Sequence, residues 1–95
     1  MKTTVEIISE ITGVSVNDIC GLKRDASFVE ARQLCIYFYR LDGLTYNSIG
    51  YCLNRTHPTC IHGYNKISDL IFVKDKRTLE LIKLINEKDR SVFVQ

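Results

Sequence analysis

Apolar residues recur at helical spacing along most of this chain, and no stretch before the C-terminus alternates apolar and polar residues as a strand does. The spacing predicts helices over residues 3–12, 16–20, 28–42, 46–53, 58–73 and 78–88. Residues 91–95 leave three alternatives open: a frayed end, packing back onto the domain, or pairing as a strand. We therefore expect a single all-α domain over residues 1–95, with about six helices around one core.

Short polar residues and glycines mark the ends of these helices. Ser15 and Ser27 each precede an acid by three residues, which is the spacing of a capping box, and Thr45 can cap the helix that follows it. Pro58 suits a first helical turn, where its missing N–H is not needed. Residues 74–77 are expected to form a charged turn before the last helix. The predicted inward faces hold aliphatic and aromatic residues and all four cysteines, among them Val16, Ile19, Cys20, Leu34, Cys35, Phe38, Leu41, Ile49, Cys52, Leu53 and Cys60.

Length and composition favour a small binding module over an enzyme. The 95 residues contain neither a G-x-x-x-x-G-K-[ST] nor a G-x-G-x-x-G motif, and they are few for a two-domain active-site cleft. No apolar run reaches the length of a membrane span, and Glu6 and Glu10 fall where a signal peptide would be apolar. We expect a cytoplasmic, non-enzymatic protein with reduced cysteines, no cofactor, no small-molecule substrate and no membrane partner.

The net charge of +2 does not by itself indicate a nucleic-acid partner, but its distribution changes the picture. Residues 1–22 are acidic, whereas residues 54–77 carry five basic and two acidic side chains. Such an asymmetry permits a phosphate-facing surface. A solvated surface of mixed charge is the alternative that charge alone leaves open.

Residues 44–67, LTYNSIGYCLNRTHPTCIHGYNKI, predict a helix-turn-helix: a short helix, a polar turn and a second helix. In such a pair the first helix packs across the second, whose N-terminal residues can enter the major groove of DNA. The free N–H groups at that terminus favour phosphate. The side chains at the terminus or about one to two turns beyond it are Arg55, Thr56, His57, Thr59, His62 and Lys66.

The same stretch resembles the C-terminal DNA-binding domain of DnaA, the bacterial replication initiator. The signature of that family reads roughly G-R-D-H-[TS]-T-V-[LI]-H-[AG], and residues 54–63 read NRTHPTCIHG. Further matches are VSVNDI at residues 14–19, the basic pair Lys23-Arg24, the sequence ARQ at residues 31–33, and LTYNSIG at residues 44–50. The resemblance covers about residues 4–72, and residues 78–88 would add a closing helix.

The resemblance implies a Trp-repressor-like helical fold that binds double-stranded DNA. By position, Arg55, Thr59 and His62 would hold phosphates, while Thr56, His57 and Pro58 would face bases. Arg32 and Gln33 would contact the DNA backbone, and Tyr46 would meet a thymine methyl group. The basic loop of the family reaches the minor groove. The expected DNA-binding residues are thus Lys23, Arg24, Arg32, Gln33, Tyr46, Arg55, Thr56, His57, Pro58, Thr59, His62 and Lys66.

Three departures from the family pattern affect specificity. Thr56 replaces an acid that reads bases, Pro58 replaces a threonine, and Ala26 falls near the position of the minor-groove arginine. We expect DNA binding to survive better than the family's preferred sequence. The ATPase module of the family is missing from these residues, so we expect no ATP hydrolysis and favour a stand-alone relative, such as a phage or mobile-element regulator, over an excised domain.

Other functions remain as alternatives. Cys52, His57, Cys60 and His62 invite a zinc site, but their spacing lacks the paired ligands that close a tetrahedron easily. A cysteine nucleophile lacks a supporting acid. A protein-interaction adaptor that kept the fold and lost DNA binding is the main rival. A homodimer contact through the last helix is open but not indicated.

Overall fold

Six helices and one pair of two-residue strands make up the described part of the chain, residues 2–88 and 90–91 of this computed structural model. The all-α expectation is therefore confirmed. The strands β1 (Lys2–Thr3) and β2 (Arg90–Ser91) pair in parallel, with Lys2 opposite Arg90. Of the segment 91–95, Ser91 thus takes the strand alternative, and residues 92–95 lie outside the described residues. The helices are α1 (Thr4–Thr12), α2 (Val16–Cys20), α3 (Ala26–Leu41), α4 (Tyr46–Leu53), α5 (His57–Phe72) and α6 (Lys76–Asn86).

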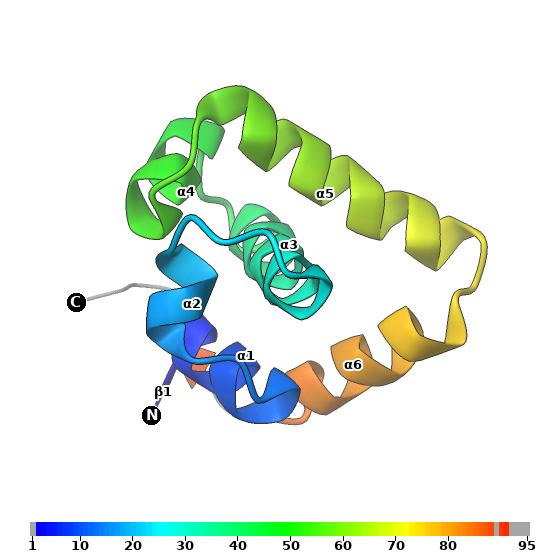
Figure 1. Ribbon diagram of the computed structural model, residues 1–95. Helices are drawn as coiled ribbons and strands as arrows, with labels where there is room; N and C mark the ends of the chain where they lie inside the picture. The colour runs from blue at the N-terminus through cyan, green and yellow to red at the C-terminus, as the bar shows by residue number, and fades with distance from the viewer. Residues whose placement is uncertain (1, 89, 92–95) are drawn as a thin grey trace.

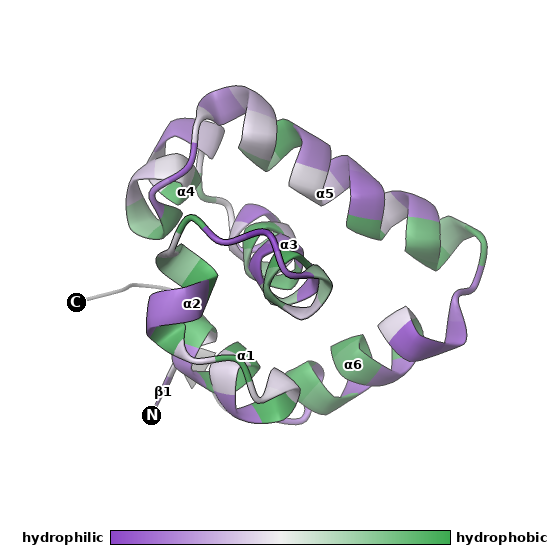
Figure 2. Ribbon diagram, in the orientation of Figure 1, coloured by the Kyte–Doolittle hydropathy of each residue, from purple (hydrophilic) through white to green (hydrophobic). Residues whose placement is uncertain are grey.

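Helix α3 is the centre of the molecule. Figure 1 looks nearly along its axis and shows the other helices arranged around it. The buried side chains of α3 include Leu34, Cys35, Ile36, Phe38 and Tyr39, and helices α1, α2, α4 and α5 pack against them. Colouring by hydropathy shows green, apolar segments on the helices around α3, and purple, polar segments in the α2–α3 connector (Figure 2). The core therefore forms around the central amphipathic helix α3.

The polar residues at helix starts cap the following helix in two of three cases. The Oγ atom of Ser15 accepts a hydrogen bond from the Asp18 N–H, and Thr45 Oγ1 accepts one from the Ser48 N–H, each at 3.1 Å. The expectation for Ser27 is wrong, because α3 begins at Ala26 and Asp25 takes the N-cap position. Ser27 therefore lies within the first turn.

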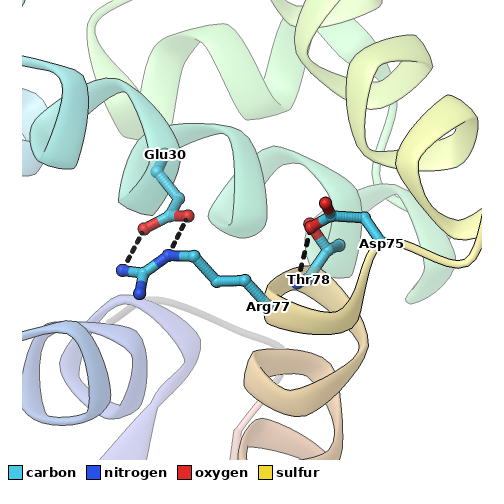
Figure 3. Close-up of polar contacts among 4 residues, drawn as sticks. All are labelled: Glu30, Asp75, Arg77 and Thr78. Atoms are coloured by element: carbon cyan, nitrogen blue, oxygen red, sulfur yellow. Dashed lines mark hydrogen bonds and ion pairs between the residues drawn. The ribbon is translucent and has the colours of Figure 1, made fainter.

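The last helix begins earlier than the hydrophobic pattern predicts. Asp75 is its N-cap, so Lys76 and Arg77 are helical and only Lys74 and Asp75 remain in the turn. The Asp75 carboxylate accepts hydrogen bonds from the Thr78 N–H at 3.0 Å and from the Thr78 hydroxyl at 2.8 Å (Figure 3). These bonds lower the pKa of Asp75. The sequence pattern did not identify Asp75 as an N-cap, because it lies between lysines in the charged run 74–77, which predicts a turn.

Helix α6 is also tied to α3 by a salt bridge. Arg77 donates from Nε and Nη2 to the two carboxylate oxygens of Glu30, at 2.8 and 2.9 Å (Figure 3). The side chain of Arg77 is exposed, so we expect this pair to orient α6 more than to stabilise the fold. Arg77 is thereby engaged within the protein.

Several residues expected in the core are exposed, and two of them are Val16 and Leu41. Val16 is 40% exposed and Leu41 54% exposed. Both stand at the end of a helix, Val16 as the first residue of α2 and Leu41 as the last of α3, where neighbouring helices cover less of the side chain. Within the described ranges, no helix is both long and apolar enough to cross a membrane.

Tyr39 places a hydroxyl group in the core. The side chain is fully buried, and its Oη atom has no hydrogen-bond partner among the described residues. Burial raises the pKa of this phenol. A buried polar group without a partner destabilises the folded state by desolvation.

We therefore expect Tyr39→Phe to raise the free energy of unfolding by about 1 kcal/mol, because the ring stays and the unpaired hydroxyl goes. Urea denaturation followed by circular dichroism measures the change. Tyr51→Phe is the control, since Tyr51 is 91% exposed and should not change stability. A loss of stability in Tyr39→Phe would mean that the hydroxyl has a partner in solution.

Candidate nucleic-acid interface

Helices α4 and α5 are joined by a three-residue turn whose geometry depends on two unusual positions. Asn54 ends α4 in the left-handed conformation, with φ of 56°. The Arg55 N–H then donates to the Gly50 carbonyl at 2.8 Å. A Cβ atom on Gly50 would lie 2.4 Å from the Arg55 carbonyl oxygen, so only glycine lets the turn fold back this closely. The turn thereby fixes where α5 begins.

The first turn of α5 is exposed to solvent. Thr56, His57, Pro58 and Thr59 are all exposed, and Pro58 occupies the first turn as predicted. Thr56 is the N-cap residue but makes no side-chain capping bond, because its hydroxyl lies 2.9 Å from that of Thr59. The first N–H groups of α5 therefore have no side-chain acceptor, and together with the helix dipole they favour an anion.

His57 is held by an aromatic neighbour on α4. The rings of His57 and Tyr46 are stacked, with centroids 5.6 Å apart and an angle of 30° between planes. The Arg40 guanidinium carbon lies 4.5 Å from the Tyr46 ring centre, and Arg40 also donates to the Leu44 carbonyl. Tyr46 is half-buried as a result. The Tyr46 ring therefore packs against His57, the residue predicted to face bases.

A cleft of about 510 Å³ runs between the α2–α3 loop, the start of α3 and the first half of α5. Its charged lining residues are Arg24, Arg32 and Arg55, with no acidic side chain among them. The ion pairs between described residues lie elsewhere, at Lys2–Glu10 and Arg77–Glu30. The cleft therefore carries uncompensated positive charge. It also brings together four other residues predicted for the site: Gln33, Thr56, Thr59 and His62.

Arg32 lies inside the protein rather than on a phosphate-facing surface. Its side chain is 5% exposed. Nε donates to the Ile19 carbonyl at 2.6 Å, and Nη2 to those of Asp18, Gly21 and Lys23 at 3.0 to 3.3 Å. Desolvation by burial, followed by repulsion from Arg55, lowers the pKa of Arg32. Sequence reasoning missed this inward position because an arginine in a basic segment is usually exposed.

Arg55 also binds backbone carbonyls. Its Nη1 donates to the Asn54 carbonyl at 2.8 Å, and its Nη2 donates to the Gly21 carbonyl of the α2–α3 loop. The residue is half-buried and lines the cleft. Gly21 thus accepts from Arg32 and from Arg55, which joins the loop to the helix-turn-helix.

The remaining candidates, Lys23 and Lys66, are not part of the cleft lining. Lys23 is exposed beside it on the loop, and Lys66 is exposed further along α5, lining a separate apolar cleft of about 360 Å³ that includes Glu30. The neighbours that were not anticipated include Leu22 and Asn54 in the cleft, and Arg40 on the Tyr46 ring. Leu22 could have been predicted as a site residue, because it directly precedes the basic pair Lys23-Arg24. Nothing in the sequence pointed to Arg40.

The cysteine and histidine residues are not gathered as a metal site would require. Cys60 is buried, whereas His57 and His62 are exposed. Across residues 2–88 and 90–91, no group of three potential ligands lies close enough to hold an ion. Burial raises the pKa of all four thiols, which disfavours the reactive thiolate.

Comparison with known proteins places this helix-turn-helix in a family. The family described as "Bacterial dnaA protein helix-turn-helix" matches residues 1–67. The chain is 36% identical over 75 residues to the chromosomal replication initiator protein DnaA of Tropheryma whipplei (strain Twist), a match that covers 78% of this chain. It is 35% identical over 86 residues to DnaA of Oenococcus oeni and 32% identical over 90 residues to DnaA of Mycoplasma capricolum, covering 85% and 93% of this chain.

These matches concern a small part of each relative. The chain spans 16% of the Tropheryma protein, 19% of the Oenococcus protein and 20% of the Mycoplasma protein. The six-helix architecture and the turn between α4 and α5 agree with the family description. The chain belongs to the family of bacterial DnaA helix-turn-helix domains.

Proposed function

We propose that this domain binds double-stranded DNA without catalysis, through the N-terminal end of α5 and the adjacent α2–α3 loop. The observation that carries the proposal is the arginine-lined cleft between these two segments, which has no acidic side chain in its lining. DNA presents closely spaced phosphates, so a surface with uncompensated positive charge binds it by releasing counterions. An exposed helix end beside that charge fits the width of the major groove.

The proposal divides the exposed residues by role. Lys23, Arg24 and Lys66 neutralise phosphates, since their charges face solvent. Thr59 and His62 line the cleft and approach the sugar-phosphate backbone near the free N–H groups of α5. Base edges are met by the exposed side chains at the helix tip, Thr56, His57 and Pro58, with Tyr46 behind His57.

Two finer statements belong to the same proposal. Binding prefers some sequences, because the residues at the tip of α5 differ in hydrogen-bonding capacity. The biological role is related to replication-origin recognition, in line with the names of the relatives, and the domain itself does not hydrolyse ATP. A regulator that recognises other sites through the same surface would share this chemistry.

The salt dependence of binding tests the proposal. Fluorescence anisotropy with a labelled duplex gives the binding constant at several salt concentrations. A plot of the logarithm of the binding constant against the logarithm of the salt concentration should be less steep by about 0.9 in Arg24→Gln, because one phosphate contact is lost. Lys83→Gln removes the same charge from the exposed side of α6 and should leave the slope unchanged. An absent salt slope in the unmodified domain, or an equal loss of slope in both variants, would contradict the proposal.

A further inference from the structure

The loop between α2 and α3 has almost no backbone hydrogen bonds of its own. Among the described residues, the Gly21 N–H donates to the Asp18 carbonyl, and the N–H groups of residues 22–25 make no backbone–backbone bond. Leu22, Lys23, Arg24 and Asp25 are all exposed. A segment with so few internal bonds is expected to move unless side chains hold it.

One buried guanidinium bonds the carbonyl groups of the loop and of the helix end before it. Arg32, on the second turn of α3, donates to the carbonyls of Asp18, Ile19, Gly21 and Lys23. Ile19 belongs to the last turn of α2, where carbonyls have no helical N–H partner, and the neighbouring Asp18 carbonyl also accepts from the Gly21 N–H. The planar fork of arginine can reach several acceptors at once, which a lysine ammonium on its flexible chain does less well.

A second arginine ties the same loop to α5. The Gly21 carbonyl that accepts from Arg32 also accepts from Nη2 of Arg55, in the turn before α5. The two DNA-facing segments, the α2–α3 loop and the helix-turn-helix, therefore meet at one backbone oxygen. The two guanidinium groups help to set the separation of these segments, alongside the packing of α2 against α4.

We infer that Arg32 is a positioning residue: it holds the α2–α3 loop at a fixed distance from the tip of α5, so that Lys23 and Arg24 meet the duplex together with Thr56 and Thr59. It does not itself neutralise a phosphate. This inference rests on the proposed DNA binding. It is supported by the 5% exposure of Arg32 and by the carbonyls that accept from its Nε and Nη2 atoms.

The charge-preserving variant Arg32→Lys separates positioning from phosphate contact. If Arg32 positions the loop, the lysine variant should bind the duplex about tenfold more weakly at every salt concentration. Its salt slope should stay unchanged, because Lys23 and Arg24 still neutralise phosphates once binding has ordered the loop. Arg77→Lys is the matched control, because Arg77 is exposed on α6, outside the proposed interface, and this variant should bind the duplex as the wild type does. Wild-type affinity in Arg32→Lys would overturn the inference.

Backbone ¹⁵N relaxation without DNA supplies a readout that general destabilisation would not produce. Order parameters of residues 22–25 should fall in Arg32→Lys and in Arg55→Lys, while those of α5 stay unchanged. Uniform loss across the domain, or no loss in the loop, would count against a positioning role. No duplex is present in this experiment, so its result does not depend on whether the domain binds DNA. A failure of the positioning role can therefore be distinguished from a failure of the proposed function.

The wild-type protein provides a test that does not depend on any variant folding. The Nε–H signal of Arg32 should be visible in the free domain and should not shift when duplex is added. The Arg24 Nε–H signal should shift. A shift at Arg32 as large as that at Arg24 would show direct contact with DNA and overturn the inference.

Discussion

Gly50→Val is expected to lower the free energy of unfolding by about 3 kcal/mol, at the upper end of the range for overpacked sites. The first side-chain atom would lie 2.4 Å from the Arg55 carbonyl oxygen and 3.7 Å from the Cys60 sulfur. The Arg55 oxygen is part of the backbone, in a turn fixed by the bond from the Arg55 N–H to the Gly50 carbonyl. The turn must therefore open, and α5 must shift with it. Urea denaturation measures the loss of stability.

Asn47→Val is the matched control for this experiment. Asn47 is exposed on the same helix, so the same β-branched side chain should change stability by no more than about 0.5 kcal/mol there. Equal stability of the two variants would mean that α4 and α5 do not approach each other in solution as the structure describes.

Substitutions at the tip of α5 are expected to change which base pairs are preferred, by about 1–3 kcal/mol at individual positions. Thr56→Ala and His57→Ala each remove a hydrogen-bonding side chain that is exposed and supported from behind, Thr56 by Thr59 and His57 by Tyr46. Arg55→Ala should instead weaken binding to all sequences alike, because its guanidinium holds carbonyls of the turn and the loop. Selection of bound duplexes from a random pool, repeated for each variant, measures the preference.

The division of roles depends on the contrast between these three variants. If Arg55→Ala altered the preferred sequence as strongly as His57→Ala, or if all three lost affinity uniformly, the assignment of base-facing and positioning residues would be wrong. Circular dichroism of each variant is the control for folding.

Helix order and most helix boundaries could be predicted from the sequence because they depend on local chemistry. The 3.6-residue spacing of apolar residues, the caps at Ser15 and Thr45, and Pro58 in a first turn each act within a few residues. Ser27 misled the prediction because Asp25, two residues earlier, also fits an N-cap, and local sequence does not decide between them.

The positions of the charged residues depended on contacts distant in sequence. The position of Arg32 in the sequence motif predicts a contact with DNA. In the structure, however, its Nε and Nη2 atoms donate to carbonyls 9 to 14 residues earlier. Arg55 reaches Gly21 across 34 residues. Helix periodicity carries no information about such bonds, since they form only when α2, α3 and the turn before α5 have packed together.

The central claim is that DNA meets this domain at the tip of α5 and at the α2–α3 loop together. Amide chemical-shift mapping of the wild-type domain, titrated with a duplex selected from a random pool, tests it most directly. We predict that the largest changes fall in residues 21–24 and 55–63, with little change along α6. Changes centred on α6, on the exposed Phe72 and Val73, or absent throughout would contradict it.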